Sequence, residues 1–299
     1  MRARVLVCLL LAAALAGCQE SGFDESKETA RPLKVQDALG DIGGTKVPGQ
    51  GERPATLTLD ALDDTLALGV KPVWASVPGG RIPDHLRSAA RGVAPAPPVT
   101  SLDMAALEAA DPDVILASKQ DQERLYPDLS RIAPTIVTDA TGSGWQLSLR
   151  LHGEALGRTN DAERLLIDWD RRLAQARREI TRGRVVSVVL VTRSAVRGAG
   201  ADSFAAKLLQ DAGLARPRAQ ERPGESLSVE SDQLDGDLIL LAVAPGAEAA
   251  ARRLERSPAW RRLDAVRSGA VMRVDPAIWW SRGGIHAARA ALGDLVAAP

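Results

Sequence analysis

Apolar residues in the first half of the chain form short runs that alternate with segments of helical periodicity. Residues 55–59 and 70–76 are strand-like, and residues 62–68 between them repeat with helical spacing. The rhythm recurs further along, with a helix predicted at 102–110 and apolar strands at 114–117 and 135–138. Continuous apolar strands that alternate with helices indicate a parallel sheet covered on both faces. We therefore predict an α/β lobe here.

The pattern changes between residues 146 and 182, where apolar residues recur with the period of an α-helix. Gly157 interrupts the run, and Thr159 or Asn160 can cap a second segment that ends near Thr181. At 1.5 Å per residue that segment would be about 33 Å long. Since the other elements are short, we expect a helix of this length to bridge two bodies.

The second half of the chain returns to alternating strands and helices. They are predicted in turn at residues 185–192, 202–212, 237–242, 247–255, 271–274 and 285–298. The pattern thus predicts three parts: an N-terminal α/β lobe at 34–145, an interlobe helix at 146–182 and a C-terminal α/β lobe at 183–299.

The N-terminus has the pattern of an export signal. Arg2 and Arg4 precede an apolar run at 5–16, which is shorter than the roughly 20 residues that a membrane-spanning helix needs. The run ends in Leu-Ala-Gly-Cys, which resembles the bacterial lipobox, so we predict a lipoprotein signal peptide at 1–17 and lipidation of Cys18. Two or more lipid chains hold a protein stably at a membrane. The alternative is an unmodified cysteine near an ordinary cleavage site.

A polar segment follows the predicted lipid anchor. Residues 18–33 carry charges and no apolar periodicity, so we predict a flexible leader. Residues 35–39 and 46–48 flank three glycines and predict a small hairpin at the start of the fold.

Charge and composition narrow the functional classes. The chain has 38 basic and 38 acidic residues and no long basic block, which argues against nucleic-acid binding. After loss of the signal only Cys18 would remain, so no disulfide can form within the chain, and the three histidines do not have metal-ligand spacing. We find no nucleophile elbow, P-loop or dinucleotide-binding motif. We therefore predict neither a resident metal nor an enzyme.

Several segments together resemble one protein family. They read LGVKPV at 68–73, LEAADPDVI at 107–115, DAGL at 211–214 and WRRLDAVRSGAV at 260–271. Their sequences and order resemble the periplasmic binding proteins that carry iron-siderophore and vitamin B12 complexes to ABC importers. The resemblance implies two α/β lobes with mainly parallel central sheets, joined by one long rigid helix. This is the class III periplasmic-binding-protein fold.

The resemblance also implies the function and the partners. It indicates a lipid-anchored solute-binding protein that captures a ferric siderophore between its lobes and delivers it to an ABC permease. Hydroxamate chelates are favoured over catecholate chelates. Family members that ligate haem or bare ferric ion rely on Tyr or His, whereas this chain has one tyrosine, Tyr126. We therefore expect a preformed chelate, with no protein–metal bond and no covalently bound cofactor.

Other hypotheses about the function remain open. The ligand could be cobalamin or haem, and the protein could be a sensor or accessory binding lipoprotein without a permease partner. An enzyme acting on the chelate is a further alternative. We expect a monomer that is exported and anchored to the outer face of the cell membrane, or held in the periplasm where the cell has an outer membrane.

Candidate ligand residues follow from the position of the strands. In open α/β sheets ligands bind beyond the carboxyl ends of the strands, and Arg donors with aromatic walls suit oxygen-rich chelates that have apolar spacers. Six candidates come just past predicted strands, and the family resemblance adds Trp145. The predicted ligand residues are therefore Trp74, Lys119, Trp145, Arg193, Trp279, Trp280 and Arg282. Gln120, Arg81 and His85 are nearby. The patterns around Trp169 and Trp260 predict core positions instead.

Docking to the permease in this family uses one acidic side chain on each lobe. The resemblance places the first on Asp63, with Asp64 beside it. On the second lobe the expected glutamate is absent, and Asp202 or Asp211 are the possible substitutes. This departure leaves transport less well supported than ligand binding.

Overall fold

The computed structural model describes residues 33–35, 45–138 and 142–299. The predicted signal peptide, Cys18 and the leader up to residue 32 lie outside the described residues. Among the helices that are described, none combines the length and the apolar composition needed to cross a bilayer.

The first lobe is built on a five-stranded sheet in which every neighbouring pair of strands is parallel. Its strands, in spatial order, are β5 (Pro95–Ala96), β4 (Trp74–Ser76), β3 (Pro54–Thr56), β6 (Val114–Ser118) and β7 (Thr135–Thr138). All residues of β6 are buried, as expected for a central strand covered on both faces.

Four helices accompany this sheet. They are α1 (Leu59–Ala67), α2 (Met104–Ala109), α3 (Lys119–Gln122) and α4 (Tyr126–Ile132). The side chain of Thr58 caps α1 and that of Asp103 caps α2, each by accepting a backbone N–H of the first turn. Ahead of the sheet, β1 (Leu33–Val35) and β2 (Thr45–Val47) pair antiparallel. The first strand begins before the predicted arm at 35–39, and residues 36–44 lie outside the described residues.

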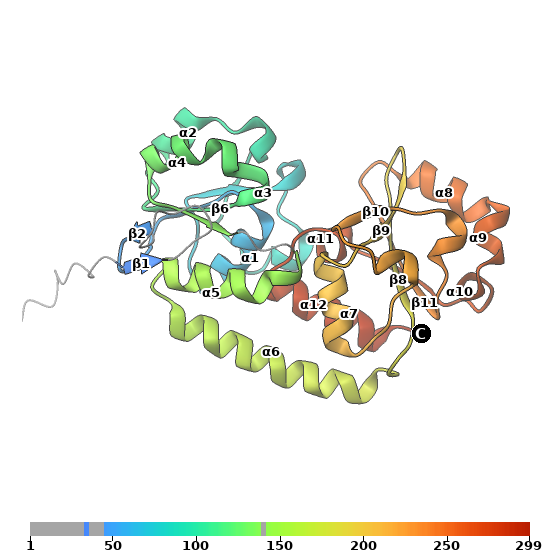
Figure 1. Cartoon of the computed structure of the whole chain (residues 1–299). Coiled ribbons are helices and arrows are strands. Elements are labelled where there is room, and N and C mark those ends of the chain that lie inside the picture. Colours follow the sequence, from blue (N-terminus) through green and yellow to red (C-terminus); the bar gives the residue numbers. More distant parts are fainter. Residues whose placement is uncertain (1–32, 36–44, 139–141) are drawn as a thin grey trace, which may run out of the picture.

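Two helices connect the lobes. They are α5 (Trp145–Ala155) and α6 (Thr159–Glu179), and Gly157 lies between them with a φ of 66°, which favours glycine. Figure 1 shows α6 running along one side of the molecule from the first lobe to the second. Its buried face includes Leu166, Trp169 and Leu173. The predicted break at Gly157 and the core position of Trp169 are confirmed.

The second lobe has a five-stranded sheet of mixed direction. In spatial order its strands are β10 (Ser226–Ser228), β9 (Val196–Ala199), β8 (Val186–Val191), β11 (Leu238–Val243) and β12 (Val271–Val274). The last three are parallel, whereas β9 and β10 run antiparallel to their neighbours. The prediction omitted β9 and β10 because they are short and carry polar residues.

The remaining helices follow the strands of this lobe. They are α7 (Phe204–Ala212), α8 (Glu248–Arg256), α9 (Pro258–Arg262), α10 (Asp264–Arg267), α11 (Pro276–Trp279) and α12 (Ile285–Ala297). The last helix, α12, packs against α1, α6 and α7, so it contacts both lobes (Figure 1). The prediction of two α/β lobes with mainly parallel sheets is confirmed.

Candidate functional site

A cavity of about 720 Å³ lies between the two lobes. Its first-lobe wall is formed where β3, β4, β5 and β6 end, with Thr58, Ser76 and Pro98 among the lining residues. Its second-lobe wall consists of Glu225 and residues 280–282. The cavity therefore lies beyond the carboxyl ends of the first sheet, where open α/β folds bind ligands.

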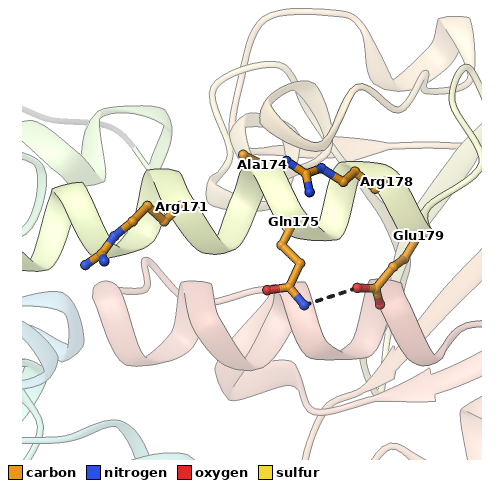
Figure 2. A pocket seen from close by; sticks show the side chains of 5 residues that line it. All are labelled: Arg171, Ala174, Gln175, Arg178 and Glu179. Carbon is orange, nitrogen blue, oxygen red and sulfur yellow. Dashed lines mark hydrogen bonds between the residues drawn. The ribbon is translucent and has the colours of Figure 1, made fainter.

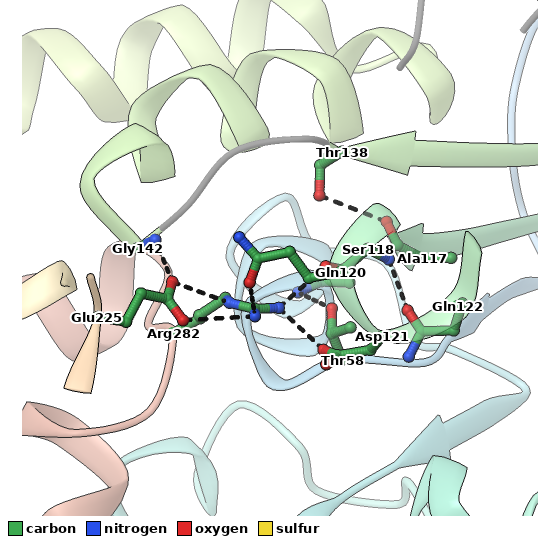
Figure 3. A network of polar contacts seen from close by, with 11 residues as sticks. Thr58, Ala117, Ser118, Gln120, Asp121, Gln122, Thr138, Gly142, Glu225 and Arg282 are labelled. Carbon is green, nitrogen blue, oxygen red and sulfur yellow. Dashed lines mark hydrogen bonds and ion pairs between the residues drawn. The ribbon is translucent and has the colours of Figure 1, made fainter. Parts of the chain in front are cut away.

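Arg282 links the two walls of this cavity. Its Nη1 donates to Ser118 Oγ at 2.9 Å and to Asp121 Oδ2 at 2.8 Å, both on the first lobe. Its Nε donates to Glu225 Oε1 at 3.2 Å on the second lobe, and Nη2 also contacts Gln120. Figure 3 shows the guanidinium in the centre of this network. Arg282 thus holds polar groups of both lobes together.

The surroundings of Arg282 favour its charged form. Burial alone would lower the pKa of the guanidinium, but the hydrogen bond and charge of Glu225 and the charge of Asp121 outweigh burial and raise it. Glu225 also accepts the backbone N–H of Gly142 at 2.9 Å, so this carboxylate is fixed from two sides. The network forms one polar edge of a cavity that is lined by both apolar and polar residues.

Trp280 is the predicted aromatic residue that lines the cavity, together with Arg282. Trp279 is buried, donates from Nε1 to Asp294 Oδ2 at 2.8 Å, and lines a smaller adjoining cavity of about 90 Å³. Trp74 is half-buried, and its Nε1 donates to Ser76 Oγ at 3.0 Å. Only Ser76 of that pair is among the lining residues.

Three other candidates lie away from the lining of this cavity. Lys119 begins α3 and is half-buried, and Arg193 is exposed in the turn between β8 and β9. Trp145 is 2% exposed and meets Trp169 edge to face at 5.3 Å between ring centroids, with Phe204 on another side. Because its ring is enclosed by core residues, Trp145 is a core residue in this structure and not a wall of the cavity.

The structure also places acidic residues in the cavity that the sequence did not single out. They are Asp60, Asp121 and Glu225. Asp60 and Asp121 follow strands β3 and β6, so the same rule that selected Trp74 could have found them. Glu225 precedes β10, a strand that the apolar pattern did not reveal, and no signal in the sequence marked it.

The predicted docking carboxylates Asp63 and Asp64 are completely buried on α1. Asp63 accepts the backbone N–H groups of His286 and Ala287 at 2.8 and 2.9 Å, and it also bonds His286 Nδ1 at 2.9 Å. Buried side chains cannot contact a partner at the surface. The prediction that Asp63 and Asp64 dock a permease is therefore wrong for this structure, and Asp63 instead caps α12 from the first lobe.

All three histidines of the chain lie around this carboxylate pair. His152 Nδ1 and Asp64 Oδ2 form a hydrogen bond of 2.9 Å, and His85 Nε2 lies 3.9 Å from Asp63 Oδ2. Burial raises the pKa of Asp64 to about 7, although the hydrogen bond from His152 acts in the opposite direction. At His286 burial lowers the pKa, but the hydrogen bond and the charge of Asp63 outweigh burial, so the pKa of His286 is raised. The cluster joins α1, α5 and α12.

The second pair of predicted docking residues is also engaged within the chain. Asp202 accepts the backbone N–H of Gly224 at 2.6 Å, which fixes the loop before β10. Asp211 forms an ion pair with Lys207 and accepts from Gln146 Nε2 at 3.5 Å. Both carboxylates therefore have structural partners on their own lobe or on α5.

A further hollow lies on the outer face of α6 (Figure 2). It is lined by Arg171, Ala174, Gln175, Arg178 and Glu179. All five belong to one helix, and Gln175 donates to Glu179 at 3.4 Å along that helix. Because no second element forms a wall, this hollow is a surface depression and not a second binding site.

Two lobes with mainly parallel sheets, a connecting helix and a cavity between them define a solute-binding protein. The chain belongs to the periplasmic binding protein family, whose model matches residues 55–278. Solved structures with the class III fold superpose on the chain, which confirms the predicted fold.

Some relatives of the chain are named for the siderophores that they bind. The chain is 27% identical over 97% of its length to the "Probable siderophore-binding lipoprotein YfiY" of Bacillus subtilis, and the match covers 95% of that protein. It is 28% identical over 82% of its length to the achromobactin-binding periplasmic protein of Dickeya dadantii, covering 85% of that protein. Staphylococcus aureus SirA complexed with staphyloferrin B superposes with a TM-score of 0.75 over 89% of this chain and 97% of SirA. At 23% identity this likeness shows the fold alone.

Proposed function

We propose that this protein captures a ferric siderophore in the cavity between its lobes and delivers it to an ABC permease. The observation that supports capture most strongly is the cavity itself, because it lies at the ends of β3, β4 and β6 and is bordered by Trp280 and Arg282. The relatives named for siderophore binding support the class of ligand.

The charges around the cavity favour hydroxamate over catecholate chelates. Among the described residues that line the cavity, three are acidic, namely Asp60, Asp121 and Glu225, and one is basic, Arg282. A ferric trishydroxamate is neutral, because three singly charged groups balance Fe³⁺, whereas a ferric triscatecholate keeps a net negative charge. A cavity with an acidic surplus repels the anionic chelate.

We further propose that the protein binds its ligand without chemical conversion and without a covalently bound cofactor. The described lining residues include no Tyr, His or Cys, and two of their three carboxylates pair with Arg282, which supports a chelate whose iron keeps its own oxygen ligands. Within the described part of the chain, no cluster of His, Cys, Asp and Glu has the arrangement of a metal site.

The site of action follows from the N-terminal sequence and the family. We propose a monomer, lipid-anchored through Cys18, with residues 18–33 as the tether on the outer face of the membrane. The permease partner rests on the family, since the four predicted docking carboxylates are buried or paired. Labelling with a radioactive fatty acid tests the anchor: label should enter the wild type and be lost in Cys18→Ser, and equal labelling of both proteins would contradict it.

Tryptophan fluorescence titration of the purified full-length chain tests the capture. A ferric trishydroxamate should quench the emission at micromolar concentration, and a ferric triscatecholate, cobalamin and haem should do so only at much higher concentration. The variant Trp280→Phe should keep the affinity within a few-fold and lose part of the quenching. If none of these ligands changes the emission of either protein at micromolar concentration, capture of ferric chelates is wrong.

A further inference from the structure

Asp60 occupies an unusual electrostatic position in the cavity. It is the second residue of α1, two residues after the capping Thr58, and it lies in the lining of the cavity. Asp60 is only 5% exposed, and its Oδ1 has no hydrogen-bond partner in the structure. A carboxylate without a partner in such a place is costly, because it loses its hydration without a compensating bond.

The other charged groups of the cavity do not supply that missing partner. Asp121 and Glu225 both pair with Arg282, at 2.8 and 3.2 Å. The five N–H groups of this guanidinium also serve Ser118 and Gln120, and none of its hydrogen bonds goes to Asp60. Two negative charges therefore remain among these four charged residues: one is shared by Asp121 and Glu225 around Arg282, and the other is on Asp60, which receives no hydrogen bond from that guanidinium.

The structure offers a second explanation, in which Asp60 only stabilises the start of α1. Acidic residues in the first turn of a helix interact favourably with its dipole. That role is served equally well by an exposed carboxylate, and it does not account for a buried oxygen without a hydrogen bond. A donor from a bound ligand would account for it.

The chemistry of the surrounding wall indicates which donor fits. Apolar residues line the same first-lobe wall, namely Leu57, Val77, Pro98, Val99 and Leu125. An aliphatic chain can lie on such a wall, and an ammonium group at its end has three N–H donors and the charge opposite to that of Asp60.

We propose that Asp60 binds a protonated amine of the captured chelate and so selects ferric chelates with an aliphatic ammonium group. This assignment rests on the proposed function, because it concerns the same cavity. Selection follows from the cost of leaving the Asp60 carboxylate buried and unpaired when a chelate without the amine is bound.

A pair of chelates that differ in one charge tests the assignment. The probes are a linear ferric trishydroxamate with a terminal primary amine and its N-acetyl derivative, each titrated against the full-length chain. We expect the wild type to bind the amine form at least about tenfold more tightly, a difference of about 1.4 kcal/mol. In Asp60→Asn the amine form should lose most of that advantage, while the affinity for the acetylated form changes less than about threefold.

Asp121→Asn is the matched control, because it removes a carboxylate from the same cavity by the same isosteric change. It should alter the binding of both chelates by a similar factor and keep their ratio. Thermal unfolding of each variant checks that the fold is intact, and the acetylated chelate serves as an internal reference for a functional cavity.

Three results would overturn the assignment. They are equal affinity of the wild type for the two chelates, an equal loss for both in Asp60→Asn, or a loss of the preference in Asp121→Asn alone. Each of these leaves capture of ferric chelates intact, because the chelates still bind. If neither trishydroxamate binds, the assignment fails together with the hydroxamate class, and the wider titration with catecholate, cobalamin and haem decides the proposed function.

Discussion

Arg282 and Asp121 form an ion pair of 2.8 Å across the cavity, although 161 residues separate them in the sequence. Asp121 lies on α3 of the first lobe, and Arg282 lies in the segment between α11 and α12. Glu225 holds the guanidinium from the second lobe. The pair therefore ties the two walls of the binding cavity to each other.

Removal of Arg282 should loosen this connection and weaken ligand binding. Arg282→Ala leaves Asp121 and Glu225 facing one another without their shared cation, which favours separation of the lobes. We expect the affinity for a ferric trishydroxamate to fall by about tenfold or more and the radius of gyration in solution scattering to increase. Arg193→Ala is the control, since Arg193 is exposed and outside the cavity lining. An unchanged affinity in Arg282→Ala would contradict the role of this residue.

Asp63 should be a stability residue and not a docking residue. In Asp63→Ala two backbone N–H groups of α12 and the ring of His286 lose their acceptor. We expect the free energy of unfolding to fall by about 2–5 kcal/mol, as for lost helix caps and broken buried polar pairs.

Asp84→Ala gives the reference for this stability measurement. Asp84 is exposed and pairs only with the exposed side chains of Arg81 and Arg87, so its loss should cost less than about 1 kcal/mol. Urea unfolding of both variants makes the comparison. Equal unfolding midpoints for Asp63→Ala and the wild type would refute the capping role.

The contribution of Asp64 to the stability of the protein should decrease as pH rises from about 4 to about 7. Burial raises the pKa of Asp64 to about 7 from its ordinary 3.8. Between these values the folded chain keeps a proton that the unfolded chain has lost, so rising pH favours unfolding by about 1.4 kcal/mol per pH unit. Asp64→Asn carries no such proton. We expect the stability difference between the wild type and Asp64→Asn to shift with pH by this slope.

The raised pKa of His286 adds to the same trend at higher pH. Its pairing with Asp63 stabilises the fold below the ordinary histidine pKa, and that stabilisation is lost as pH rises through the raised value. Asp64→Asn should retain this second decline. Parallel pH profiles of unfolding free energy for Asp64→Asn and the wild type between pH 4 and 7 would show that Asp64 is not the titrating group.

Much of the fold could be predicted because its strands and helices have clear periodicities. The central strands β6, β8 and β11 are continuous apolar runs, and α7 ends at Gly213 with a φ of 77°, as its sequence indicates. Strands β9 and β10 were missed because they are short and include polar residues. Their place in the sheet is set by pairing with each other and with β8. From the first lobe Asp63 accepts two backbone N–H groups of α12, a long-range contact that no local pattern reveals.

The site was less predictable, since the direction of a side chain is set by packing. Trp145 and Trp280 are the same residue type near expected cavity positions, yet one is enclosed by Trp169 and Phe204 while the other lines the cavity. Arg282 was a candidate because it follows a strand, but its partners Asp121 and Glu225 come from distant segments. Sequence position could therefore name the region and not the orientation.

Native mass spectrometry of the full-length chain with a ferric trishydroxamate tests the central claim most directly. We predict one ferric chelate per chain with the iron still in its chelate, and loss of the complex in the double variant Trp280→Ala/Arg282→Ala, provided that this variant unfolds like the wild type. A spectrum that holds only the free chain at micromolar chelate, or equal binding by the folded double variant, would contradict capture in the cavity between the lobes.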